Sequence, residues 1–163
     1  MRQGLVLATV LTLLGGCNGS PPGGVAAPSL EEAAIERGLV RNPAARDLTG
    51  LYARDTDRLC IVPDARGDRV GLSIDYGEGN GCSATGTVVR TGEALQFALG
   101  KDCAFAARFD GERITFPGRL PRQCATLCTG RASLTGVDVI RLSGTMAEAA
   151  AMRDAHGKLP CRG

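Results

Sequence analysis

The chain has 163 residues, with nineteen basic and seventeen acidic side chains, a formal charge of +2, and no tryptophan among its six aromatic residues. This near-neutral charge leaves no electrostatic footprint for nucleic acid, and so few aromatic side chains argue against a stacking platform for bases or sugars. The length fits one domain of ordinary size.

The first predicted element is an export signal over residues 1–16. Arg2 supplies a short positive start, and the apolar run Leu5–Leu14 follows it. A helix of ten residues rises only about 15 Å, half of a hydrocarbon core of roughly 30 Å, so the run is too short to span a membrane. A positive start, an apolar middle and small residues at the end are typical of a secretory signal peptide.

The sequence Leu14-Gly15-Gly16-Cys17 ends this segment and resembles the bacterial lipobox. In lipoproteins the cysteine thiol is lipidated and cleavage makes that cysteine the new N-terminus, so the resemblance implies a diacylglyceryl group and an N-acyl chain on Cys17. Several acyl chains anchor a protein firmly, where one anchors it marginally. Asn18 rather than Asp follows the cysteine, which by the family's sorting pattern implies the outer membrane, facing the periplasm. The alternative is a plain signal peptide with a chance cysteine.

The next two segments are a tether and a short helix. Residues 17–28 are rich in Gly, Ser, Pro and Ala and have no periodicity, which predicts a flexible tether. In residues 29–46, Ser29 and Glu32 have the spacing of a capping box, which predicts a helix to about Arg37 followed by a linker.

Residues 47–163 form the predicted folded domain. Apolar residues alternate there with period two, most clearly at Val70, Leu72 and Ile74, which is typical of half-buried strands. The pattern predicts eight strands, at 48–54, 58–63, 68–76, 82–90, 93–99, 103–107 with Phe109, 113–116 and 132–142. In the last of these the alternation slips near Thr135-Gly136, which predicts a β-bulge.

The turns between the predicted strands are short, which favours antiparallel pairing of sequence neighbours. Asp110-Gly111 predicts a type I′ hairpin. Eight such strands bury one face each by closing into a small barrel, which also removes exposed edges. A β-sandwich is the alternative. Thr145 and Glu148 form a second capping box, which predicts a helix from Met146 to about His156.

Six cysteines follow Cys17, and an even number in an exported chain predicts three disulfides with fifteen arrangements open. They are Cys60, Cys82, Cys103, Cys124, Cys128 and Cys161. Cys161 is expected to fasten the C-terminal tail to the barrel. The rival interpretation is zinc at Cys124-x-x-x-Cys128, but structural zinc needs a second pair or histidines, so we predict no metal site. Cys82 and Cys103 are expected at one end of the sheet, about 9–10 Å apart and too far for comfortable bridging.

No catalytic constellation emerges from the sequence. His156 is the single histidine, and we interpret it as the last residue of a helix, where a partial positive charge suits the helix dipole. Gly77–Gly81 lacks the Gly-x-Gly-x-x-Gly pattern between a strand and a helix and is interpreted as a turn. Asp75 and Glu78 are the nearest approach to a carboxylate pair, and nothing in the sequence raises either pKa as a glycosidase would require. We therefore predict a protein that is not an enzyme and has no cofactor.

The expected function is a non-catalytic binding or structural role in the bacterial cell envelope, with the membrane and an envelope protein as partners. A lipobox before a compact, cysteine-bridged β-barrel resembles the periplasmic lysozyme-inhibitor lipoproteins, which implies inhibition of a lysozyme-like hydrolase as an alternative. A calycin-like carrier of a small apolar ligand is another. The candidate partner-binding residues are Glu78 and Asn80 in one loop, and Arg119 and Arg122 before Cys128 with Arg131 nearby, because Arg offers bidentate donors to a carboxylate.

Overall fold

The computed structural model describes residues 29–162 except 38, 40–46 and 66, so the predicted signal peptide, the tether and Cys17 lie outside the described residues. The described chain consists of two α-helices, a 3₁₀ helix and nine strands. They are α1 (Leu30–Glu36), β1 (Gly50–Arg54), β2 (Asp57–Val62), β3 (Asp68–Asp75), β4 (Gly81–Thr91), β5 (Ala94–Leu99), β6 (Cys103–Phe109), β7 (Arg113–Thr115), η1 (Arg122–Leu127), β8 (Cys128–Thr129), β9 (Asp138–Ser143) and α2 (Met146–Ala151).

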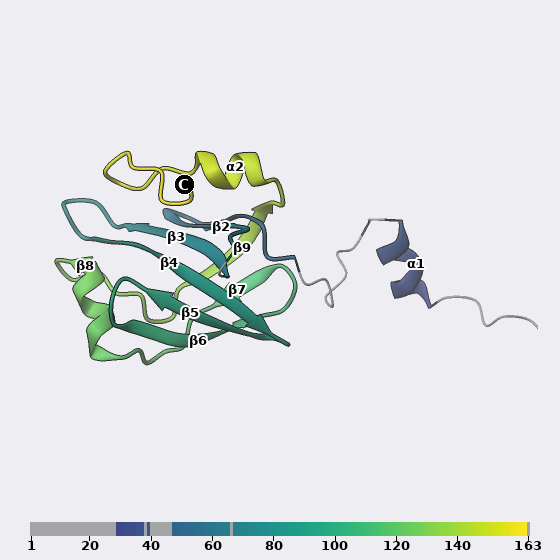
Figure 1. Ribbon diagram of the computed structural model, residues 1–163, viewed down its shortest axis with the longest axis horizontal. Helices are drawn as coiled ribbons and strands as arrows, with labels where there is room; N and C mark the ends of the chain where they lie inside the picture. The colour runs from purple at the N-terminus through teal and green to yellow at the C-terminus, as the bar shows by residue number, and fades with distance from the viewer. Residues whose placement is uncertain (1–28, 38, 40–46, 66, 163) are drawn as a thin grey trace, which may run out of the picture.

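Eight of the strands form a closed antiparallel barrel (Figure 1). Strands β1 to β7 follow one another as a meander, each paired with its sequence neighbour. The last long strand, β9, then lies between β7 and β1 and closes the ring. The short β8 is the extra strand and pairs with Gly81 and Cys82 at the start of β4. The predicted barrel is thus confirmed over the sandwich.

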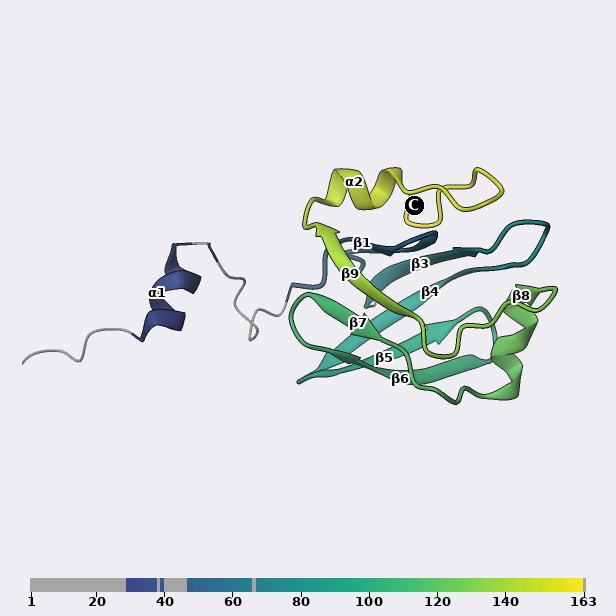
Figure 2. The ribbon, with the colours of Figure 1, turned by 180° about the vertical axis from the view of Figure 1, so that it is seen from behind.

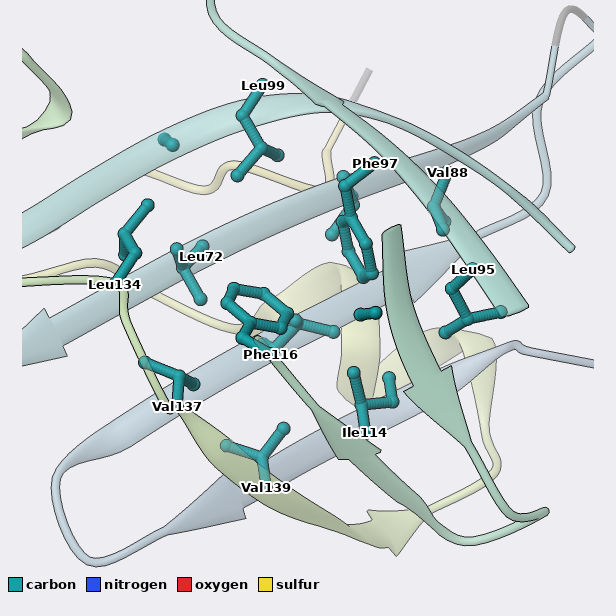
Figure 3. Packing of buried hydrophobic residues seen from close by; sticks show 14 of the residues in the cluster. Leu72, Val88, Leu95, Phe97, Leu99, Ile114, Phe116, Leu134, Val137 and Val139 are labelled. Atoms are coloured by element: carbon teal, nitrogen blue, oxygen red, sulfur yellow. The ribbon is translucent and has the colours of Figure 1, made fainter. Parts of the chain in front are cut away.

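Period-two alternation places one face of each strand in the barrel interior. In β6, buried Cys103, Phe105, Ala107 and Phe109 alternate with exposed residues. Aromatic rings meet at the centre: the Phe97 and Phe105 rings stack at 5.4 Å between centroids, and Phe116 packs edge-on against both at 5.1 and 4.7 Å (Figure 3). Side chains therefore fill the interior around these three rings.

Helix α2 and the C-terminal segment lie outside the barrel (Figure 1). A second apolar cluster of buried residues lies between them and the outer face of β2. Leu59 and Ile61 of β2 face the interior, so their neighbours Cys60 and Val62 face outward. These two side chains are buried by an external layer that includes Ala149, Met152 and Cys161. The disulfide Cys60–Cys161 joins the layers, as the sequence analysis expected for Cys161.

Helix α1 starts with the predicted capping box: the Ser29 hydroxyl accepts a hydrogen bond from the Glu32 N–H, and the Glu32 carboxylate accepts one from the Ser29 N–H. None of its residues is buried. Among the helices of the described chain, none combines the length and the apolar character that a membrane crossing requires.

The last predicted strand, 132–142, is wrong at its start, because β9 begins only at Asp138. Thr135 and Gly136 form a turn instead of a bulge, with Gly136 at a φ of +70°. Leu134 and Val137 on either side are buried in the barrel core, so burial of an irregular segment produced the apolar pattern that suggested a strand. The register irregularity lies between Leu51 and Tyr52 of β1, which pair with Ser143 and Arg141.

Two predicted local structures are also corrected. Helix α2 ends at Ala151 rather than near His156, since Asp154 accepts hydrogen bonds from the N–H groups of His156 and Lys158 and so forms a turn. The β6–β7 connection is not a two-residue type I′ turn at Asp110-Gly111, because three residues, 110–112, lie between Phe109 of β6 and Arg113 of β7. The Asp110 carboxylate accepts hydrogen bonds from two backbone N–H groups there, and this side-chain cap stabilises the longer turn.

The barrel has two ends that matter below. We call the end where the chain enters β1 the entry end, and the opposite end the distal end. Because successive strands are antiparallel, the β1–β2, β3–β4 and β5–β6 connections lie at the distal end. The segment with η1 and β8 is at this same end, far from the start of β1 (Figure 2).

Candidate functional site

The long connection between β7 and β9, residues 116–137, covers the distal end and is called the distal segment here. Two disulfides fasten its middle part to the barrel: Cys124 in η1 is bonded to Cys103 at the start of β6, and Cys128 in β8 to Cys82 near the start of β4. Buried Phe116, Leu134 and Val137 hold its two ends. The segment has little regular secondary structure but is attached to the barrel at both ends and in the middle.

The β3–β4 loop, residues 76–80, lies against the distal segment. The Asn80 Oδ1 atom accepts a hydrogen bond from the Arg131 N–H at 3.0 Å, and the Thr129 hydroxyl donates to the Gly79 carbonyl at 2.6 Å. Gly130 packs directly on the Asn80 side chain and has a φ of +61°, so a larger residue would be strained there. Asn80, a predicted partner-binding residue, instead joins two loops of the protein itself.

Glu78 differs from Asn80, because it remains presented to solvent. It lies at the tip of the β3–β4 loop, is exposed, and has a left-handed φ of +53°. The β3–β4 loop carries Glu78 and Asn80, and the distal segment carries Arg119 and Arg122. Because the loop and the segment are hydrogen-bonded to each other, all four predicted partner-binding residues lie at the distal end of the barrel.

The guanidinium groups of Arg119, Arg122 and Arg131 make no ion pair or hydrogen bond within the described chain, and all three residues are exposed. Other arginines of the barrel are engaged: Arg54 and Arg113 share the Asp138 carboxylate at 2.7 and 2.6 Å. The distal segment therefore presents three cations whose donors are available, on a backbone fixed by two disulfides. Sequence reasoning selected Arg119 and Arg122, but it could not show that they lack internal partners.

Acidic residues lie on the neighbouring distal loops. Burial, followed by the negative charge of Asp55, raises the pKa of Asp57 in the β1–β2 hairpin. Burial and then Asp57 likewise raise the pKa of Tyr76. The distal end thus has a basic part, the distal segment, beside an acidic part, the β1–β2 and β3–β4 connections.

A pocket of about 290 Å³ opens where the β3–β4 loop, η1 and the C-terminal segment meet. Asp75, Ser83, Thr126 and His156 are among its lining residues. The sequence analysis placed His156 at the end of a helix, whereas the structure places it in a turn at this pocket. The Ser83 hydroxyl donates to Asp154 Oδ2 at 2.9 Å, so within the described chain its proton is directed to a carboxylate rather than to the imidazole.

The C-terminal segment, residues 152–162, is held on the outer face of β3 and β4 by small side chains. Ser73 and Ser83 are directly opposite each other in these strands. The Ser73 hydroxyl, which is buried, accepts a hydrogen bond from the Ala155 N–H, and Ser83 donates to Asp154. Small residues on the outer face of a strand are the sequence signal that could have indicated this covered surface.

The lowered pKa of Asp154 indicates how the attachment of the C-terminal segment should respond to pH. Burial raises its pKa, but hydrogen bonds to the carboxylate from two backbone N–H groups and Ser83 outweigh burial and lower the pKa overall. A carboxyl whose pKa is lower in the folded state contributes stability above its unfolded pKa of about 3.9, and that stability is lost as the pH falls through the folded value. We expect the amide protons of Ala155 and Lys158 to lose hydrogen-exchange protection progressively as the pH falls below about 4.

Asp154→Ala should produce the same loss of protection at pH 7, and Asp102→Ala, on an exposed turn, should not. Protection factors corrected for intrinsic exchange measure the effect. Protection that stays constant to pH 2 in the wild type would contradict the role given to the carboxylate.

Among the described residues, no group of three or more His, Cys, Asp or Glu side chains is arranged to hold a metal ion. No protein-family model, curated protein or solved structure matches the chain.

Proposed function

We propose that this chain is a lipid-anchored lipoprotein of the bacterial cell envelope that has no catalytic role and binds an acidic surface on an envelope protein. The observation that carries the binding role is the set of three available guanidinium groups on the disulfide-fastened distal segment. The lipobox resemblance at Leu14–Cys17 supports the anchor, and three disulfides fit the oxidising environment of the envelope.

The positions of the two ends of the barrel support this arrangement. The chain enters the barrel at the entry end, close to Leu48, whose carbonyl accepts a hydrogen bond from the Tyr52 hydroxyl. The distal segment is at the other end of the strands. A lipid on Cys17 would attach the protein to the membrane through the entry end, and the predicted tether would leave the arginines at the distal end accessible to a partner in the periplasm.

The chemistry of the distal segment suits a carboxylate-bearing partner. A guanidinium group offers a carboxylate two parallel N–H donors. Because Arg119, Arg122 and Arg131 form no ion pair with another described residue, their charges are available to a partner. Because the segment is already fixed by Cys82–Cys128 and Cys103–Cys124, little further ordering of the backbone is required on binding.

The same guanidinium groups favour one specific partner class as a second candidate, a lysozyme-like hydrolase, whose active-site cleft contains a pair of carboxylates. Titration of the full-length chain into a lysozyme activity assay tests it. Inhibition that is lost in Arg122→Glu would support this candidate, and unchanged lysozyme activity would exclude it. The carrier alternative has no comparable support, because aromatic side chains occupy the centre of the barrel.

The anchor is tested by expressing the full-length chain in a Gram-negative bacterium and analysing detergent-extracted protein by mass spectrometry. We expect an N-terminal peptide that begins at Cys17 and carries acyl chains. Cys17→Ser should leave the signal peptide uncut or release the protein from the membrane. A free Cys17 thiol, or cleavage at another position, would contradict the proposal.

The binding role is tested by placing a photo-crosslinking amino acid at Gln123, which is exposed beside Arg122 on η1. We expect a defined crosslink to an envelope protein in cells, reduced at least tenfold by combined Arg119→Glu and Arg122→Glu. Arg108→Glu, an exposed arginine of β6, is the matched control and should leave the crosslink unchanged. The same crosslink from a probe at exposed Ala106 on β6, or indifference to the charge reversals, would contradict a distal binding surface.

A further inference from the structure

We propose a second binding site on the side of the barrel, a groove that receives a phosphate monoester group. It has a volume of about 710 Å³ and lies between the C-terminal segment and the outer face of β3 and β4. Arg69, Thr85, Thr87, Lys158 and Arg162 supply its polar groups. The proposal does not depend on the proposed function, which concerns the distal end.

The strand register builds the floor of this groove. Arg69 is paired with Thr87, and Gly71 with Thr85, so these four residues form two neighbouring rows on the outer face of β3 and β4. Pro160 of the C-terminal segment packs on Gly71, where an added Cβ atom would lie 2.5 Å from the proline side chain. Gly71 is therefore covered by the C-terminal segment, and Arg69, Thr85 and Thr87 remain beside it as an open shelf.

The groove is rich in hydrogen-bond donors and has an excess of positive charge. The Arg69 guanidinium donates to Asp64 at 3.0 Å, which uses only part of its donor set. Within the described chain, the Lys158 ammonium, the Arg162 guanidinium and the hydroxyl groups of Thr85 and Thr87 make no hydrogen bond.

The two carboxylates that line the groove do not cancel this excess. Asp64 is paired with Arg69, and Asp154 accepts three hydrogen bonds from its own turn and from Ser83. Three cations, Arg69, Lys158 and Arg162, therefore line the groove against these two carboxylates, which leaves a net charge of +1. A phosphate monoester carries a charge of about −1.5 to −2 at pH 7, opposite in sign to this lining, and its three acceptor oxygens can use the ammonium, guanidinium and hydroxyl donors.

The experiment is calorimetric titration of the full-length chain, in non-ionic detergent at constant ionic strength, with glycerol 3-phosphate as the soluble probe. We expect saturable binding that weakens at least tenfold in the double variant Lys158→Gln, Arg162→Gln. The matched control is Arg119→Gln, Arg122→Gln, which removes two cations from the distal segment and should leave the affinity unchanged. Glutarate, a dicarboxylate of similar charge, should bind at least tenfold more weakly than glycerol 3-phosphate.

Vesicles that contain phosphatidic acid, compared with pure phosphatidylcholine vesicles, distinguish a lipid headgroup from a free ester. Binding of glycerol 3-phosphate without binding to the phosphatidic acid vesicles supports a free ester as the ligand. Binding to both probes supports a lipid headgroup, provided that Lys158→Gln, Arg162→Gln abolishes the binding to the vesicles. The proposal would be overturned if neither glycerol 3-phosphate nor the vesicles with phosphatidic acid bound. It would also be overturned if glutarate bound with equal affinity, or if Arg119→Gln, Arg122→Gln weakened binding as much as Lys158→Gln, Arg162→Gln does. Because the distal variants act as controls here, failure of this groove and failure of the proposed function give different results.

Discussion

Replacing Cys60 and Cys161 together with alanine should lower the free energy of unfolding by about 4 kcal/mol, the largest loss expected from any one disulfide of this protein. The two cysteines are 101 positions apart in sequence. A disulfide acts mainly by restricting the unfolded chain, and its effect grows with the length of the loop that it closes. Even with the two other disulfides nested inside this loop, it remains the longest of the three.

Urea unfolding under non-reducing conditions measures this loss. The comparison variant replaces Cys103 and Cys124, which are 21 positions apart and should contribute about 3 kcal/mol. Hydrogen exchange provides a local readout, since loss of Cys60–Cys161 should also remove protection at Ala155, in the C-terminal segment. The role assigned to Cys60–Cys161 would be contradicted if its loss lowered the free energy of unfolding by less than the loss of Cys103–Cys124 does and left the protection of Ala155 unchanged.

Phe97→Ala should lower the free energy of unfolding by about 3–5 kcal/mol. The Phe97 side chain is 2% exposed and contacts both neighbouring rings, Phe105 and Phe116. Its removal loses buried apolar surface and leaves a cavity that strands held by backbone hydrogen bonds cannot collapse to fill. Gln96→Ala, next to it on the exposed face of β5, should change stability by less than about 0.5 kcal/mol.

The same urea measurement, made at unchanged disulfide state, compares these two variants. A loss below about 1 kcal/mol for Phe97→Ala would mean that the site tolerates a void. That result would revive the interpretation of the barrel as a carrier of an apolar ligand, which the filled interior now leaves without support.

The sequence alone was sufficient wherever the structure depends on contacts between near neighbours or on a strict period. The capping box of Ser29 and Glu32 formed as predicted, because a Ser or Thr side chain three residues before Glu needs no distant partner. At Thr145 the predicted N-cap formed, but the reciprocal bond did not, because the Thr145 N–H donates to the Ser143 hydroxyl instead of to Glu148. Alternation along β3 and β6 identified their inward faces, because successive side chains of a strand point to opposite sides. The even number of cysteines indicated three disulfides, although it left their partners open.

The same local signals predicted the barrel, but they did not predict the bounds of every strand. The sequence placed the closing strand too early, at 132–142, because buried Leu134 and Val137 imitate the alternation of a strand. The two-residue β8 and helix η1 were not predicted. Their conformation is imposed by disulfides to strands β4 and β6, which are remote in sequence.

In the candidate site, too, the sequence determined some properties and the tertiary structure decided others. The sequence by itself determined which side chains could bind a carboxylate, since that property belongs to arginine. Only the tertiary structure decided that Arg119, Arg122 and Arg131 have no partner among the residues that the structure describes, that Asn80 is used to join two loops, and that His156 lies at a pocket. The physical reason is that a side chain's availability depends on which distant groups the fold brings within hydrogen-bonding distance, and no period or spacing along the chain records that.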